Sequence, residues 1–221
     1  MFWRKKQETV KTFKTRVREF WAWFSENAAK MKTCIDERKC AELTRETSER
    51  VNALGPDFAW VYGPGASKGR HSLTLSGEGS RHLMFLCNFW AESAPEIPDW
   101  DFHSSRQPSE NVDKIKLSVN GREFAFNKTW LVPTLDHESQ RVDLRIWHPG
   151  FEDMTEHQYM NLVFLMLDEA LGEWGTTSWI GSIDPTPAAD REAMPLKDLP
   201  EFIEELESKH GWKHERPDQT Y

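Results

Sequence analysis

Apolar side chains recur every three or four residues in the first part of the chain, and this spacing predicts a helix over residues 9–31. The apolar face of this helix comprises Val10, Phe13, Val17, Phe20, Trp21 and Phe24. A second, highly charged helix is expected over residues 36–54, and its thin apolar stripe comprises Leu43, Val51 and Leu54. Gly55 and Pro56 end this helix, because glycine caps helices and proline cannot continue them. Residues 1–54 therefore form a helical segment that we expect to pack on the main domain.

From residue 55 onward, short alternating or aromatic runs are separated by turns. Residues 58–62 and 71–75 flank a Gly-Pro-Gly turn and predict a hairpin, and Asn120-Gly121 predicts a second hairpin. The strands of the second hairpin cover residues 114–119 and 122–126. Further strands are expected over residues 100–104, 129–134, 141–147 and 178–183. Further helices are expected at residues 81–92, 155–171 and 199–208. The helix over residues 155–171 begins with a capping box and ends at Gly172.

The order hairpin, helix, strand occurs twice, over residues 58–106 and again over residues 129–183, which indicates an internal ββαβ pseudo-duplication. We therefore expect an α+β protein with a mostly antiparallel central sheet and helices packed on it. The N- and C-terminal segments are expected to be helical. The expected organisation is one domain overall, with the helical segment 1–54, an α+β core over residues 55–184, and a linker and C-terminal helix over residues 185–221.

The chain is acidic, with a net charge of -8 over 221 residues, and it holds 11 tryptophans, which argue against disorder. The negative charge disfavours nucleic acids and anionic membranes as partners. Residues 1–18 are the exception, with seven basic side chains against one acidic side chain. They form either a solvated helix face with a frayed end or an arm for an acidic surface, and the first interpretation is favoured.

Cysteine usage and the lack of a leader sequence indicate a soluble, cytoplasmic protein. Cys34, Cys40 and Cys87 are odd in number and lack the spacing of a metal site, so thiols are expected rather than disulfides. No signal peptide precedes the first helix, and no apolar run approaches the ~20 residues that a bilayer span requires.

The sequence contains no recognisable catalytic template. A phosphate-binding loop and a nucleophile elbow are both absent, and the Gly-Pro-Gly run is a turn because Pro64 lacks an amide donor. His210 and His214 have a metal-ligand spacing, but Gly211 between them disrupts the helix that such a pair needs. We therefore assign no catalytic residue, no metal ligand and no cofactor, which favours a non-enzymatic role.

A group of carboxylates at the end of the apolar helix is the strongest candidate for a ligand-binding site. The candidate residues are Asp168, Glu169, Glu173, Arg106 and Trp100. A half-buried carboxylate needs a cationic partner, which Arg106 or Arg145 can supply. Either these groups bind a ligand, or they form a salt bridge that fixes the helix to the sheet, and the structural interpretation is favoured.

Two segments resemble a family of uncharacterised bacterial proteins: Trp21-Ala22-Trp23-Phe24, and Leu167-Asp168-Glu169-Ala170-Leu171-Gly172-Glu173. The resemblance implies a single α+β domain with helical ends, and it carries no activity or catalytic residues. We expect a non-enzymatic binding or regulatory protein that acts through contacts with another protein and is itself a monomer or homodimer. The alternative is a small-molecule-binding protein or an enzyme with its acidic site at the end of the helix over residues 155–171.

Overall fold

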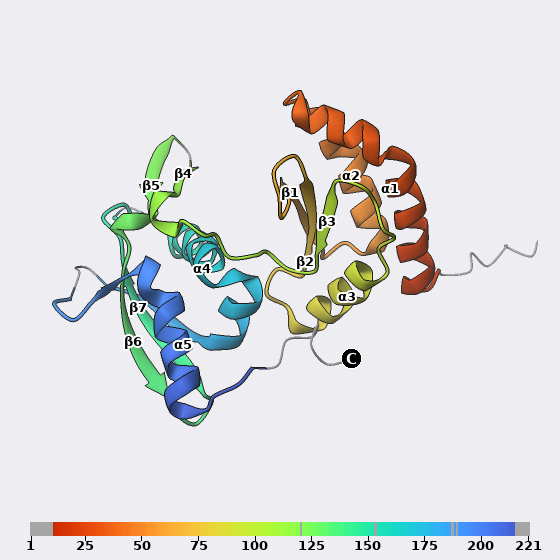
Figure 1. Ribbon diagram of the computed structural model, residues 1–221. Coiled ribbons are helices and arrows are strands. Elements are labelled where there is room, and N and C mark those ends of the chain that lie inside the picture. The colour runs from red at the N-terminus through yellow and green to blue at the C-terminus, as the bar shows by residue number, and fades with distance from the viewer. Residues whose placement is uncertain (1–10, 120, 153, 187, 189, 215–221) are drawn as a thin grey trace, which may run out of the picture. The chain divides into compact units, whose positions relative to one another are not determined.

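The computed structural model describes residues 11–119, 121–152, 154–186, 188 and 190–214 (Figure 1). The chain is divided into two compact units. The N-terminal unit runs to Glu78 and includes Phe85–Ser104, and the C-terminal unit comprises Gly79–Met84 and the chain from Ser105 onward. No described helix has the length and apolar character needed to cross a membrane.

Two helices open the N-terminal unit, as the apolar spacing predicted. Helix α1 covers Phe13–Asp36 and begins at Thr12, whose side-chain oxygen accepts a hydrogen bond from the backbone N–H of Thr15. Helix α2 covers Cys40–Leu54 and ends at Gly55. The predicted apolar positions of both helices that are buried are Val17, Phe20, Trp21, Phe24, Leu43, Val51 and Leu54. Val10 of the predicted face lies outside the described residues.

A three-stranded sheet completes the N-terminal unit. Its strands are β1 (Ala59–Pro64), β2 (His71–Ser76) and β3 (Trp100–His103), and helix α3 (Arg81–Glu92) lies between β2 and β3 in the sequence. Strand β1 pairs antiparallel with β2 in the predicted hairpin, and β3 pairs parallel with β2. The parallel pair requires a long connection, which α3 supplies.

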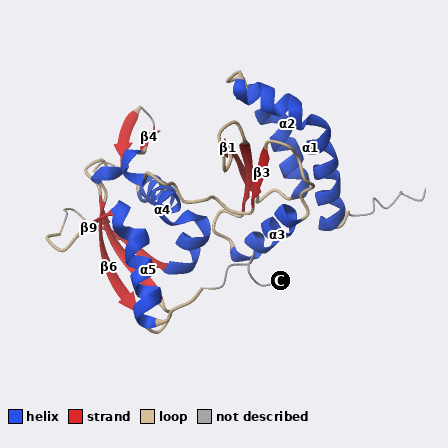
Figure 2. Ribbon diagram, in the orientation of Figure 1, coloured by secondary structure: helices blue, strands red, loops and turns tan. Residues whose placement is uncertain are grey.

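The C-terminal unit contains the remaining strands and two further helices (Figure 2). The elements are β4 (Lys116–Val119), β5 (Arg122–Ala125), β6 (Trp130–Asp136), β7 (Arg141–Trp147), α4 (Glu156–Trp179), β8 (Ile180–Pro185), β9 (Met194–Pro195) and α5 (Leu199–His210). Short 3-10 helices cover Val112–Lys114, Phe126–Lys128 and Leu196–Asp198. Strands β4 and β5 form the predicted two-stranded hairpin, and the other four strands form a sheet in the order β8-β7-β6-β9.

The α+β class is confirmed, and the ββαβ order occurs twice with the same pairing. In each motif the two strands before the helix are antiparallel, and the strand after the helix pairs parallel with the second of them. Most strand pairs are antiparallel, as expected, but the strands form three sheets instead of one central sheet, and each ββαβ motif closes its own sheet. Trp212, which follows the last helix, is only 5% exposed and belongs to the core of the C-terminal unit.

Candidate functional site

Helix α4 is interrupted at the position that the sequence predicted as its end. The helix begins with the predicted capping box, in which the side chains of Thr155 and Gln158 each bond the other residue's backbone N–H. Gly172 has φ 72° and ψ 160°, a backbone conformation that essentially only glycine adopts. The helix then resumes and continues to Trp179, so the last predicted strand begins at Ile180 instead of residue 178.

The chain segment that follows β3 packs directly against this break. The backbone N–H of Glu173 donates to the carbonyl of Arg106 at 3.0 Å, and the N–H of Ser109 donates to the carbonyl of Glu169 at 2.8 Å. A Cβ atom at Gly172 would lie 3.0 Å from both the Arg106 carbonyl oxygen and the Cδ atom of Pro108. Glycine is therefore required here by the close approach of the backbone as well as by its own conformation.

The three candidate carboxylates are all engaged by this segment or by Gly79. Glu173 is 1% exposed, and its two oxygens accept the backbone N–H groups of Gly79 and Arg106, each at 3.1 Å. Asp168 is 7% exposed and accepts a hydrogen bond from Nη1 of Arg106 at 3.1 Å. The hydroxyl of Ser109 donates to Glu169. We call Arg106, Asp168, Glu169 and Glu173 the carboxylate cluster.

Burial dominates the electrostatics of Asp168. Desolvation raises the pKa of its carboxyl group to about 6, and the neighbouring charge of Glu173 acts in the same direction. The guanidinium of Arg106 opposes this increase by stabilising the charged form. The carboxylate is therefore ionised at neutral pH at a cost in free energy, which Arg106 only partly offsets.

The structure thus brings together four of the five residues that the sequence singled out, and the exception is Trp100. That side chain is 3% exposed within the N-terminal unit, where its indole N–H donates to the carbonyl of Ala28 at 3.3 Å. Arg106 is in the segment after β3 and not in a strand, and Arg145 pairs with Asp190 at 3.4 Å. Sequence reasoning did not identify Gly79 and Ser109, because each donates to a carboxylate that is distant in the chain and no local pattern marks such a donor.

Tryptophans of the N-terminal unit lie mainly in an aromatic core. Trp21 stacks on Trp90 with ring centroids 4.6 Å apart, and its indole N–H donates to the Trp90 carbonyl at 2.9 Å. Trp23 is also buried: its indole N–H donates to Glu46 of α2 at 2.8 Å, and Arg50 lies over its ring.

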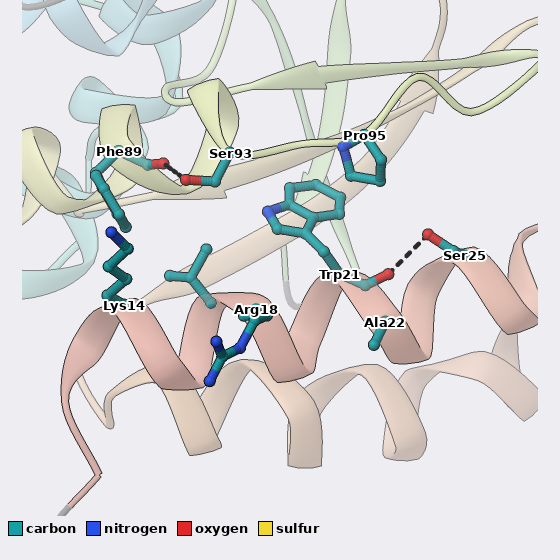
Figure 3. A pocket seen from close by; sticks show the side chains of 9 residues that line it. Lys14, Arg18, Trp21, Ala22, Ser25, Phe89, Ser93 and Pro95 are labelled. Carbon is teal, nitrogen blue, oxygen red and sulfur yellow. Dashed lines mark hydrogen bonds between the residues drawn. The ribbon is translucent and has the colours of Figure 1, made fainter.

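A groove of about 410 Å³ lies on the N-terminal unit between α1 and the end of α3. Figure 3 shows Trp21 extending from α1 toward Pro95, and Lys14 directed toward Phe89. The lining residues are Lys14, Val17, Arg18, Trp21, Ala22, Ser25, Phe89, Ser93 and Pro95. The hydroxyls of Ser25 and Ser93 donate to helix carbonyls at 2.8 and 2.7 Å, so they offer no free donor and the walls are effectively apolar. We call this feature the α1–α3 groove.

Two cations lie along the α1–α3 groove. Lys14 and Arg18 are exposed, and neither has an ion pair or a side-chain hydrogen bond with any residue that the structure describes. By contrast, Lys11 pairs with Glu19 at 2.7 Å, and the Arg16 guanidinium lies 5.5 Å from the ring centroid of Phe13. The groove therefore combines an apolar floor with uncompensated positive charge.

A second cavity of about 690 Å³ lies beside β3 in the same unit, and Trp100 contributes to its lining. Two of its charged groups compensate each other: Nε of Arg70 donates to Asp101 at 3.1 Å, and the N–H of Ala66 donates to the same carboxylate at 2.7 Å. Burial lowers the pKa of His103, which also lines this cavity, and the charge of Asp101 opposes the shift. The remaining charged residue of the lining is Glu96, so the described lining of this cavity lacks the unpaired cations of the α1–α3 groove.

Comparison with protein-family models, with curated proteins and with solved structures found no match. Within the described part of the chain, no three His, Cys, Asp or Glu side chains are grouped so that they could hold a metal ion. The carboxylate cluster and the α1–α3 groove are the two features of the described structure that point to a function.

Proposed function

We propose that this chain is a non-enzymatic binding or regulatory protein, and that it contacts another protein through the α1–α3 groove. The single observation behind this proposal is an apolar groove lined by two cations that have no partner in the described structure. Tryptophan and arginine beside an apolar recess are typical of the centres of protein interfaces. We also place the protein in the cytoplasm, because its three cysteines are thiols and two of them are buried.

The alternative function, a small-molecule or catalytic site at the carboxylate cluster, is favoured by one observation, the raised pKa of Asp168. The hydrogen bonds of the cluster argue against it. Glu173 uses both oxygens on backbone N–H groups, and Asp168 binds the side chain of Arg106. A ligand would have to break these contacts, so the cluster serves better as a clamp that holds the segment after β3 on α4.

Site-specific photocrosslinking in the cells that make the protein tests the proposed function. A photoreactive benzoylphenylalanine replaces Ala22, which is exposed and lines the α1–α3 groove. The matched control places the same group at Lys30, which is exposed on α1 but does not line the groove. We expect a discrete protein adduct from position 22 and none from position 30. Equal labelling from both positions, or no protein adduct from position 22, contradicts the proposed function.

A further inference from the structure

The basic residues of α1 are placed where the helix itself disfavours them. The N-terminal end of a helix carries partial positive charge, which acidic side chains stabilise and basic side chains destabilise. The first turn of α1 contains no acidic residue, and Lys14 lies within it. Lys14 and Arg18 are also four positions apart, a spacing at which like charges repel one another.

These two cations share one helix face with the apolar floor of the α1–α3 groove. Val17 and Trp21 follow at three and seven positions from Lys14, and Ser25 follows at eleven positions. At 1.5 Å per residue, the stripe from Lys14 to Ser25 is about 16 Å long, or about three helical turns. This length suits a short peptide segment that places apolar side chains on the floor and carboxylates against Lys14 and Arg18.

We infer that the α1–α3 groove receives an acidic, amphipathic segment of a partner protein, an inference that rests on the proposed function. Charge complementarity favours an acidic partner, because Lys14 and Arg18 form no ion pair with any residue that the structure describes. An apolar floor built from Val17 and Trp21 suits a peptide better than a phosphate backbone. The net charge of -8 also repels nucleic acids and anionic membranes as whole surfaces.

The test begins with the adduct formed at position 22, whose attached segment is identified by mass spectrometry. That segment is then made as a peptide, and its affinity is measured for the unmodified chain and for two charge-reversal variants. The first variant carries Lys14→Glu and Arg18→Glu. The matched control carries Lys30→Glu and Arg45→Glu, which change the net charge equally at exposed positions outside the groove. Circular dichroism checks that both variants keep the helical content of the chain.

We expect the crosslinked segment to contain Asp or Glu residues beside apolar ones. The Lys14 and Arg18 variant should bind its peptide about tenfold more weakly, because two attractive pairs become repulsive, whereas the control should change by less than about twofold. Added salt should weaken binding to the unmodified chain, where it screens attraction, and strengthen binding to the groove variant, where it screens repulsion.

Failure of this inference is distinguishable from failure of the proposed function. Two results overturn the inference and leave the groove as a binding site. In the first, the crosslinked protein segment lacks acidic residues; in the second, its affinity is unchanged by the charge reversal at Lys14 and Arg18. A crosslink to a second copy of the chain, to lipid or to nucleic acid also overturns it. Loss of every specific adduct at position 22 removes both proposals together.

Discussion

Asp168 should make the stability of the protein fall as the pH rises, and replacing it with asparagine should remove this dependence. The folded pKa of Asp168 is about 6, against an ordinary value of 3.8. Between these two values the folded state binds the proton more tightly than the unfolded state, so the free energy of unfolding decreases with increasing pH. At about 1.4 kcal/mol for each pH unit, the loss is about 3 kcal/mol, complete above pH ~7.

Urea denaturation followed by circular dichroism between pH 4 and pH 8 measures this effect. Across this range, the unfolding free energy of the unmodified chain should fall by about 3 kcal/mol relative to that of Asp168→Asn. Asp190→Asn is the control, because Asp190 is an exposed partner of Arg145, and exposed ion pairs contribute little to stability. A flat curve for Asp168→Asn, or one with the opposite slope, would show that Arg106 outweighs burial and would refute the reasoning.

Four further substitutions, at three positions, test the break in α4 and its start, each by urea denaturation at pH 7. Gly172→Ala should lower the free energy of unfolding by about 1–3 kcal/mol through backbone strain, and by more if the Arg106 carbonyl and Pro108 cannot move. A variant as stable as the unmodified chain would contradict the close approach of these groups. Glu173→Ala should lower the free energy of unfolding by about 3 kcal/mol, because two backbone donors lose a charged acceptor. Glu173→Gln should lower it by about half as much, and equal losses for the two variants would show that the charge contributes nothing. Thr155→Ala should cost about 1 kcal/mol through loss of the capping box, and no measurable cost would mean that solvent caps this end equally well.

Local patterns predicted most of the elements, because each depends on residues that are close together in the chain. The spacing of Val17 and Trp21 identified α1, and the Gly172 break was visible as a glycine after an apolar helix. The pairing of Asp168 with Arg106 was also predictable, because a carboxylate on a buried helix requires a cation. These inferences needed only periodicity, turn chemistry and the cost of burying charge.

Features that depend on distant parts of the chain were not predictable in this way. Trp100 was grouped with the carboxylates, but no local pattern shows that it belongs to another compact unit. Trp23 is not on the predicted apolar face of α1, yet it is buried because α1 also packs against α2. The α1–α3 groove forms only where α1 meets residues 89–95, so Lys14 and Arg18 read as an ordinary solvated face.

The boundaries of the two units have a practical consequence for dissecting the protein. The C-terminal unit is not continuous in sequence, because it includes Gly79–Met84 as well as the chain from Ser105 onward. A truncation that begins at Ser105 would therefore delete the backbone donor of Gly79 and leave one oxygen of Glu173 without it. A single cut cannot separate the units cleanly. A circular permutant or a two-fragment complementation that retains residues 79–84 is the appropriate way to study the C-terminal unit alone.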